Sequence, residues 1–311
     1  MKRTNGHIGI VLLLAAGLLA GCSGSDGELT TGSGESTPKE IRLTPNVWQV
    51  MDATAARGTR AATFDNATAL QAERSFTCAV YNANATTTYI SSIAVEWNDP
   101  QWEFSDGKHF WPMEGSLDFF AYMPAAETLA TDAAYITGPT YTTARNPQFT
   151  CDMTKTQTKE FVWALTTGQN KAANSAGVAM NFTHPFARIS FSLSPASGTH
   201  VTINSISIDG TDFYTTGTCT FDGTTSTWSD LGGAAALGVF SIGNSYLVIP
   251  NDYGSKTITV NATWDDWSNV TKNVSSGAVT INWQPGYSYT YNLTLREEAL
   301  IVETTKYTEQ W

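Results

Sequence analysis

The chain has 311 residues, of which 41% are hydrophobic, 12% aromatic and only 14% charged, and its formal net charge is −11. This negative charge repels phosphate backbones, and no basic patch with interleaved aromatic residues is present, so we expect no nucleic-acid partner. The hydrophobic content is sufficient for two domains of ordinary size or for one large β domain.

The N-terminus has the three parts of an export signal. Lys2 and Arg3 are followed by an apolar run over residues 8–20, which is too short to span a bilayer as a helix. The sequence Leu-Ala-Gly-Cys that ends at Cys22 resembles the bacterial lipobox, in which the cysteine is lipidated and the preceding signal is removed. We therefore predict a signal peptide over residues 1–21 and a lipoprotein anchored through Cys22. The alternative is an ordinary secretory signal with an incidental cysteine.

Residues 22–39 are rich in Gly, Ser and Thr and predict a flexible tether. Ordered structure is expected from Ile41 onward, and the apolar and aromatic patterns that follow are typical of strands. The expected strands cover 41–51, 76–81, 93–97, 117–122, 182–193, 201–208, a short segment ending at 221, 246–249, 258–264, 287–293 and 300–311. Short helical turns are expected at 65–73 and 127–135.

Strands separated by turn signals at intervals of roughly ten residues indicate an all-β protein made of β-sandwiches. The sequence SPASGT, over residues 194–199, interrupts two strand-rich halves. We therefore predict an N-terminal β-sandwich over residues 40–196 and a C-terminal one over residues 197–311.

Three cysteines remain if Cys22 is lipidated: Cys78, Cys151 and Cys219. Three thiols cannot all pair within one molecule, so either one disulfide forms or the thiols are free and buried. The cysteines and histidines do not have the spacing of a metal site, and we expect no metal and no cofactor.

Motifs for catalysis are missing from the sequence. No nucleophile elbow, zinc-protease or nucleotide-binding pattern occurs. His109 and His184 each lie beside aromatic residues and a proline, which is typical of packed structural histidines, and His200 is distant in sequence. Most tryptophans, including Trp97, Trp102, Trp111, Trp163 and Trp283, are expected in cores or at sandwich edges. We predict that the protein is not an enzyme.

Several segments together resemble the fimbrillin lipoproteins of the Bacteroidales, also called type V pilins. They are Thr59-Arg60-Ala61, WEFSDGKHFWPMEGSLDFFAYMP over 102–124, NFTHPFARISFSL over 181–193, and Pro285-Gly286-Tyr287-Ser288-Tyr289 with Leu293. The resemblance implies two transthyretin-like β-sandwiches in tandem. It also implies a structural or adhesive pilus subunit, exported as a lipoprotein to the outer membrane and found in the fimbrium after processing.

The resemblance further implies how the subunit assembles. An arginine-specific protease would cut after Arg60 or Arg57, and a first strand over residues 41–51, with Ile41, Leu43, Val47 and Met51, would be lost. An extended segment of another fimbrial subunit would then fill the groove by β-strand addition. The implied partners are these subunits, the outer membrane through the lipid before processing, and host or bacterial surface ligands.

The end of the chain leaves two roles open. The segment with Ile301, Thr305, Tyr307 and Trp311 would be either a donor strand or the last core strand, so stalk, tip and anchor subunits are not distinguished. A second reading of the whole chain is a surface glycan-binding lipoprotein without catalytic activity, in which exposed aromatic residues stack on sugars.

Overall fold

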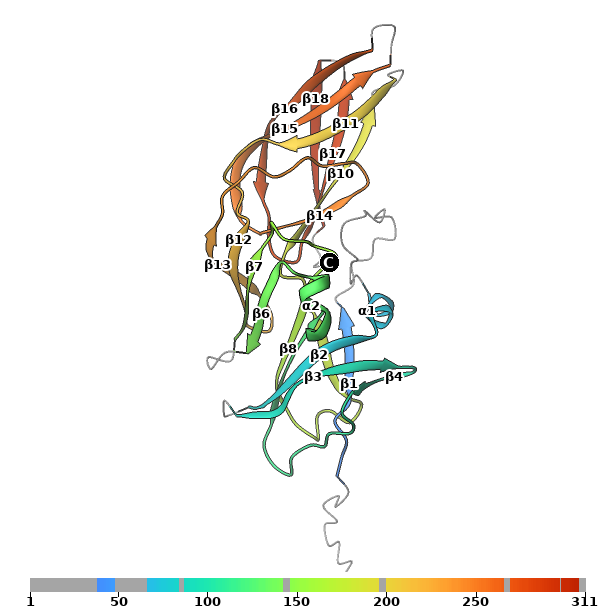
Figure 1. Ribbon diagram of the computed structural model, residues 1–311, viewed down its shortest axis with the longest axis vertical. Coiled ribbons are helices and arrows are strands. Elements are labelled where there is room, and N and C mark those ends of the chain that lie inside the picture. Colours follow the sequence, from blue (N-terminus) through green and yellow to red (C-terminus); the bar gives the residue numbers. More distant parts are fainter. Residues whose placement is uncertain are drawn as a thin grey trace, which may run out of the picture. The chain divides into compact units, whose positions relative to one another are not determined.

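The computed structural model describes residues 38–47, 66–83, 87–141, 146–195, 200–265, 269–296 and 298–307 (Figure 1). Three sheets and two short helices make up the described part of the chain, which confirms the all-β prediction. Residues Glu40–Trp311 form one compact unit, separate from Met1–Lys39.

The first sheet has seven strands and nearly closes on itself. Its order is β8 (Val162–Gln169), β5 (Leu117–Met123), β2 (Ser75–Asn82), β3 (Thr88–Asn98), β4 (Gln101–Phe104), β1 (Leu43–Val47) and β9 (Val178–Phe182). A bridge between Trp163 of β8 and Thr183, directly after β9, joins its two outer strands. The first hydrophobic core, which includes Phe76, Phe119 and Phe182, is built from this sheet.

The second sheet has four strands, in the order β13 (Ser226–Gly232), β12 (Thr216–Phe221), β7 (Pro147–Asp152) and β6 (Ile136–Tyr141). Side chains from β7 and β12 pack with Phe120 and Tyr122 of β5 and with Trp163 of β8 in another core. Phe119 and Ala121 of β5 belong to the first core. β5 is therefore buried along its whole length, as its continuous apolar sequence indicates.

The third sheet folds into two layers. Its order is β11 (Val201–Ile208), β15 (Asp252–Trp264), β16 (Val270–Asn282), β18 (Ala299–Lys306), β17 (Ser288–Arg296), β10 (Ala187–Pro195) and β14 (Ser245–Val248). The register links β16 to β18 through one residue pair, Ser276 and Leu300. This link divides the sheet into two groups of strands: β11, β15 and β16 form one, and β18, β17, β10 and β14 form the other. Side chains from both groups meet in a further core, as in a β-sandwich.

The two helical turns expected from the sequence are α1 (Ala67–Glu73) and α2 (Ala126–Asp132). Asn66 caps α1 by accepting a hydrogen bond from the backbone of Ala69 at 2.9 Å. No helix among the described residues has the length and apolarity needed to cross a membrane.

One expected strand is in fact two. The sequence predicted a single strand over residues 182–193, but β9 ends at Phe182 and β10 begins at Ala187. Pro185 lies in the break, where a residue without an N–H cannot continue a ladder. As a result β9 pairs with β1 in the first sheet, whereas β10 pairs with β17 in the third.

Strand pairing does not follow the predicted division between residues 196 and 197. β10 precedes this position but is paired over Arg188–Pro195 with β17. Likewise β7 lies in the first half of the chain and β12 in the second, and they are neighbours in one sheet. The strand order thus mixes the two halves, and a division into independently folding domains remains a prediction.

The three cysteines of the folded part are free and buried. Burial raises the pKa of the Cys151 thiol to about 12, and it also raises the pKa of Cys78 and of Cys219. Because the thiolate is the reactive form, these side chains act as small hydrophobic groups in the native protein. Of the two alternatives that the sequence left open, the structure has the free thiols.

Candidate functional site: the slot occupied by the first strand

β1 lies inside the first sheet, between β4 and β9 (blue in Figure 1). It runs parallel to β9, in register from Leu43 opposite Val178 to Val47 opposite Phe182. Val178 donates its backbone N–H to the carbonyl of Arg42 at 2.8 Å, and the hydroxyl of Thr44 donates to the carbonyl of Val178 at 3.1 Å. β4, in contrast, shares only one register pair with β1, Leu43 with Trp102. The attachment of β1 is therefore one-sided.

The side chains of β1 alternate between core and surface. Ile41, Leu43 and Val47 are at most 5% exposed and belong to the first core. Thr44 and Asn46, between them, are exposed. This is the period of two expected for a strand with one buried face. The three described residues of the predicted removable strand thus all lie in one core; the fourth, Met51, lies outside the described residues.

A glycine allows β1 to approach the residue before β9 closely. Gly177 has φ +120°, and a β-carbon there would lie 3.1 Å from Cγ2 of Thr44 and 3.3 Å from the carbonyl oxygen of Arg42. The positive φ and the close backbone both favour a residue without a side chain. Gly177 therefore fits the presence of β1 beside it.

The N-terminal end of β1 is held by the loop after β4. Glu40 forms a bridge with Phe110, and the backbone N–H of Ile41 donates to the carbonyl of His109 at 2.8 Å. The carboxylate of Glu40 lies 3.2 Å from the amine of Lys108. These contacts are near the surface, where such an ion pair contributes little, so the buried side chains supply most of the attachment.

A cavity of about 550 Å³ opens beside β1 on the side of β4. Its lining includes Ile41 and Leu43 of β1 together with Trp97, Trp102 and Phe104. The rings of Trp97 and Trp102 are 5.5 Å apart, and Trp102 also packs on Phe76 at 5.0 Å. The near-absence of β1–β4 pairing leaves this space.

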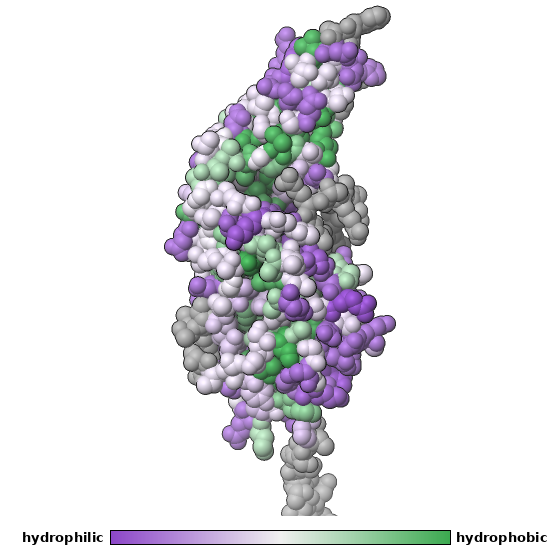
Figure 2. Space-filling view, viewed as in Figure 1, coloured by the Kyte–Doolittle hydropathy of each residue, from purple (hydrophilic) through white to green (hydrophobic). Residues whose placement is uncertain are grey.

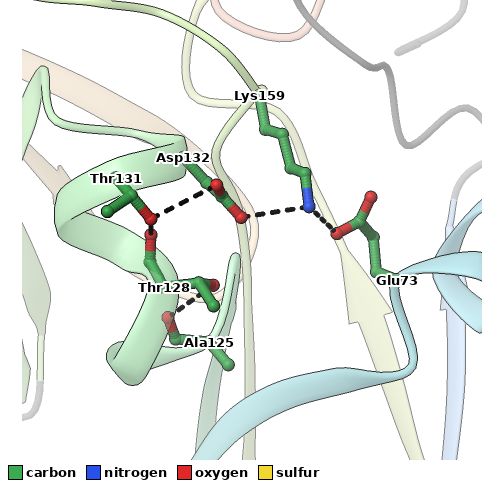
Figure 3. A network of polar contacts seen from close by, with 6 residues as sticks. All are labelled: Glu73, Ala125, Thr128, Thr131, Asp132 and Lys159. Atoms are coloured by element: carbon green, nitrogen blue, oxygen red, sulfur yellow. Dashed lines mark hydrogen bonds and ion pairs between the residues drawn. The ribbon is translucent and has the colours of Figure 1, made fainter.

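An ion-pair network holds the first element that follows the candidate processing segment. Figure 3 shows the amine of Lys159 between the carboxylates of Glu73, at the end of α1, and Asp132, at the end of α2. The distances are 2.5 Å and 3.0 Å, and the three side chains are 16–26% exposed. Lys159 thus fastens α1 to the body of the protein.

We expect Lys159→Met to lower the free energy of unfolding at pH 7 by about 1 kcal/mol, because both carboxylates lose their cation. Partial burial lowers the pKa of Lys159, but the hydrogen bonds from its amine to Glu73 and Asp132 raise it more, so the pKa lies above its ordinary value. The folded state therefore binds this proton more tightly, and the contribution is lost as the pH rises through the titration of the lysine.

Urea unfolding at pH 7 measures the loss of unfolding free energy, and urea unfolding at pH 11 measures how far this loss depends on the charge of Lys159. Lys155→Met is the matched control, because Lys155 is exposed and lies four residues earlier in the same connection between β7 and β8. A gap between wild type and Lys159→Met that is as large at pH 11 as at pH 7, or an equal loss in the control, would contradict the assignment.

The lipidation and processing residues predicted from the sequence, Cys22, Arg57 and Arg60, lie outside the described residues, as does Trp311. The last described strand, β18, is antiparallel to β17 over its full length. Ile301 is 43% exposed and Thr305 is also exposed, whereas Leu300 is buried on the opposite face. Tyr307 follows β18 and donates its backbone N–H to the carbonyl of Ser288 at 3.1 Å.

The histidines occupy structural positions. His184 is buried, and its Nδ1 lies 2.9 Å from the fully buried carboxylate of Glu160. His109 packs edge-on against Phe104 and lies 2.7 Å from Asp106. In the part of the chain that the structure describes, no cluster of three or more acidic, histidine or cysteine side chains is arranged to hold a metal.

The sequence-based prediction missed the strand that accepts β1. Val178, Met180 and Phe182 of β9 alternate as buried residues, and this alternation is readable in the sequence. Their parallel partner lies more than 130 residues earlier in the chain, so periodicity alone does not pair them.

Comparison with known proteins matches this chain to one family profile and to several solved structures. The profile of the fimbrillin-like family matches residues 59–311. A fimbrial protein from Bacteroides vulgatus is similar in structure, with a TM-score of 0.60 and 18% identity over 86% of this chain and 99% of the other. A putative cell adhesion protein from Bacteroides uniformis gives a TM-score of 0.55 and 17% identity over 86% and 98%. A search of curated proteins finds no match.

The family consists of fimbrial structural and adhesion proteins rather than enzymes, as the sequence indicated. With most of its length matched by the profile, the chain belongs to the fimbrillin-like family.

Proposed function

We propose that this protein is a fimbrial subunit that assembles by strand exchange at the slot occupied by β1. The subunit is exported as a lipoprotein precursor with a lipidated Cys22 and reaches the outer membrane. Cleavage after Arg57 or Arg60 frees the segment that carries β1, and an extended segment of another subunit replaces it. The observation that carries the proposal is the position of β1, which is buried inside a sheet and is paired along its whole length only with β9, whereas it shares one register pair with β4.

The geometry of the first sheet favours exchange over unfolding. β9 is held independently of β1, because Thr183 and Trp163 exchange two backbone hydrogen bonds at 2.8 Å and 3.2 Å. The hydroxyl of Thr166 also donates to the carbonyl of Ala179 at 2.8 Å. Departure of β1 therefore leaves the backbone groups of β9 and an apolar slot available to a new strand.

An incoming strand must make the same backbone pairing as β1 and bury the same kind of side chains. It must run parallel to β9 and present apolar side chains at the positions of Ile41, Leu43 and Val47. Ladder hydrogen bonds would then supply affinity, and the buried side chains would set the register. Because donor and acceptor surfaces differ, such contacts are head-to-tail and build a filament in the fimbrium.

We assign β18 to the fold of its own subunit. It is paired with β17 from Ala299 to Lys306 and contributes Leu300 to the core. The residues suggested for a donor strand, Ile301 and Thr305, are on its exposed face. This arrangement supports the role of β18 as a core strand and gives it no role as a donor.

The double variant Arg57→Lys, Arg60→Lys tests the proposal in cells. We expect wild-type protein to begin at Gly58 or Ala61 by mass spectrometry and to enter polymer ladders together with other fimbrial subunits, which supply the donor strand. The double variant should keep its lipidated N-terminus and stay monomeric, with polymer reduced at least tenfold. Arg74→Lys is the matched control, because Arg74 is an exposed arginine just after α1. Polymer that persists in the double variant, or wild-type protein that retains Cys22, would contradict the proposal.

A further inference from the structure

A second cavity, separate from the slot of β1, has an aromatic wall. Its volume is about 300 Å³. Six aromatic side chains contribute to the lining: Phe213, Tyr214, Phe240, Tyr246, Tyr253 and Trp283. Figure 2 shows hydrophobic side chains at the surface in the region where β14 and the segment before it lie. A recess of this size with concentrated aromatic residues is typical of small-ligand sites.

Hydrogen bonds fix the aromatic residues in place. The indole N–H of Trp283 donates to the hydroxyl of Tyr291 at 2.8 Å, and the hydroxyl of Tyr253 donates to the carbonyl of Ile249 at 3.0 Å. The hydroxyl of Tyr246 accepts the backbone N–H of Ser241 at 2.8 Å. Because these polar atoms already have protein partners, the rings do not need to reorganise to meet a ligand, and the cavity is preformed.

Polar groups complete the lining. They are supplied by Thr154, Gln157, Glu160, Arg188 and Ser245. Arg188 is 9% exposed, and its Nε donates to the hydroxyl of Ser288 at 3.4 Å. The carboxylate of Glu160 is fully buried, so the more exposed polar lining consists of the hydroxyl and amide groups of Thr154, Gln157 and Ser245. Hydroxyl groups, which both donate and accept, suit such a lining of donors and acceptors.

We propose that this cavity binds one neutral pyranose ring, either as a free sugar or as the terminal residue of a surface glycan. A pyranose has an apolar C–H face, which fits the aromatic wall, and a rim of hydroxyls, which fits the polar residues. The cavity volume is at the lower end for ligand sites and suits one ring rather than an oligosaccharide. The proposal does not depend on strand exchange, since the two cavities share no lining residue.

The edge of the cavity allows a test that leaves the core intact. Ala236 and Gly238 line the cavity and are exposed. The neighbouring Val239 is 66% exposed and is not part of the lining. Ala236→Trp should therefore obstruct the cavity, whereas Val239→Trp adds the same side chain beside it.

Saturation-transfer NMR with the methyl pyranosides of D-glucose, D-galactose, D-mannose and L-fucose is the experiment. We expect at least one of them to bind the wild-type protein, with a Kd on the order of 1 mM for a single ring. Ala236→Trp should weaken this binding at least tenfold and Val239→Trp less than twofold. Glucuronic acid and benzyl alcohol serve as charged and apolar comparison probes.

Each other outcome overturns the proposal. It fails if none of the four pyranosides binds, if glucuronic acid or benzyl alcohol binds as well as the best of them, or if Ala236→Trp leaves binding unchanged. Thermal unfolding of both tryptophan variants checks that they are folded. If Ala236→Trp is not, Gln157→Ala replaces it, because Gln157 is a half-buried lining residue whose amide donates to the carbonyl of Met153 at 3.1 Å. Its loss should weaken binding about tenfold, and unchanged binding would again refute the site.

Discussion

Trp163→Ala is expected to lower the free energy of unfolding by about 3–5 kcal/mol, the range for removing a large aromatic side chain from a core. Trp163 lies in β8 and is fully buried. Its ring stacks on Phe221 with centroids 5.1 Å apart and meets Phe149 edge-on at 4.8 Å. Phe149 and Phe221 belong to β7 and β12, so the change removes contacts between the first and the second sheet.

Chemical denaturation followed by circular dichroism measures this effect. Trp163→Phe is the control, because it keeps an aromatic ring and should cost about 1–2 kcal/mol. The shape of the transition is also informative, since β7 and β12 come from different halves of the chain. We expect one transition that shifts as a whole. Two transitions, of which only one moves, would show instead that the halves fold independently, and a loss below about 1 kcal/mol would contradict the role of Trp163.

Strands with strong local patterns could be predicted from the sequence. Ala187, Ile189 and Phe191 of β10 lie in one core, on the face that the alternation predicted, and the run Leu117–Tyr122 forms most of β5. In these segments the face that a side chain takes depends on the period of the strand, which the sequence displays directly.

Pairing between distant segments could not be predicted in this way. Cys151 of β7 and Cys219 of β12 lie on neighbouring strands, but 68 residues separate them in sequence. The contact between His184 and Glu160, and the position of β10 in the third sheet, depend on the same non-local topology. Such contacts follow from how whole sheets pack, which no local period encodes.

At the candidate site, too, local features could be predicted from the sequence and non-local pairing could not. A strand over residues 41–51 was expected; the structure has β1 over Leu43–Val47, and Ile41, Leu43 and Val47 are buried. That the strand runs parallel to β9 and barely touches β4 was not readable, because it depends on a register set across the whole first sheet. The aromatic cavity was likewise unforeseen, since its lining is drawn from separate segments between Met153 and Trp283.

Val47→Asp is expected to release β1 while the rest of the protein stays folded. Val47 is 1% exposed, and burial of an unpaired carboxylate costs several kcal/mol. Each large apolar side chain of β1 contributes about 1.5–3 kcal/mol when buried, so losing Val47 and adding this penalty removes most of the docking free energy. The slot would then be open without cleavage, and faster hydrogen exchange at the backbone amides of β9 should report its opening.

Hydrogen exchange separates release of β1 from unfolding of the sheet. The amide of Val178, which donates to Arg42, should exchange at least 100-fold faster in Val47→Asp than in wild type, whereas the amide of Thr183, which donates to Trp163, should stay protected. Asn46→Asp is the matched control, because it places the same carboxylate one residue earlier on the exposed face of β1. If both amides lose protection together, β1 is an integral part of the fold rather than an exchangeable strand. If neither amide loses protection, β1 is attached to β9 more strongly than the burial of its side chains explains.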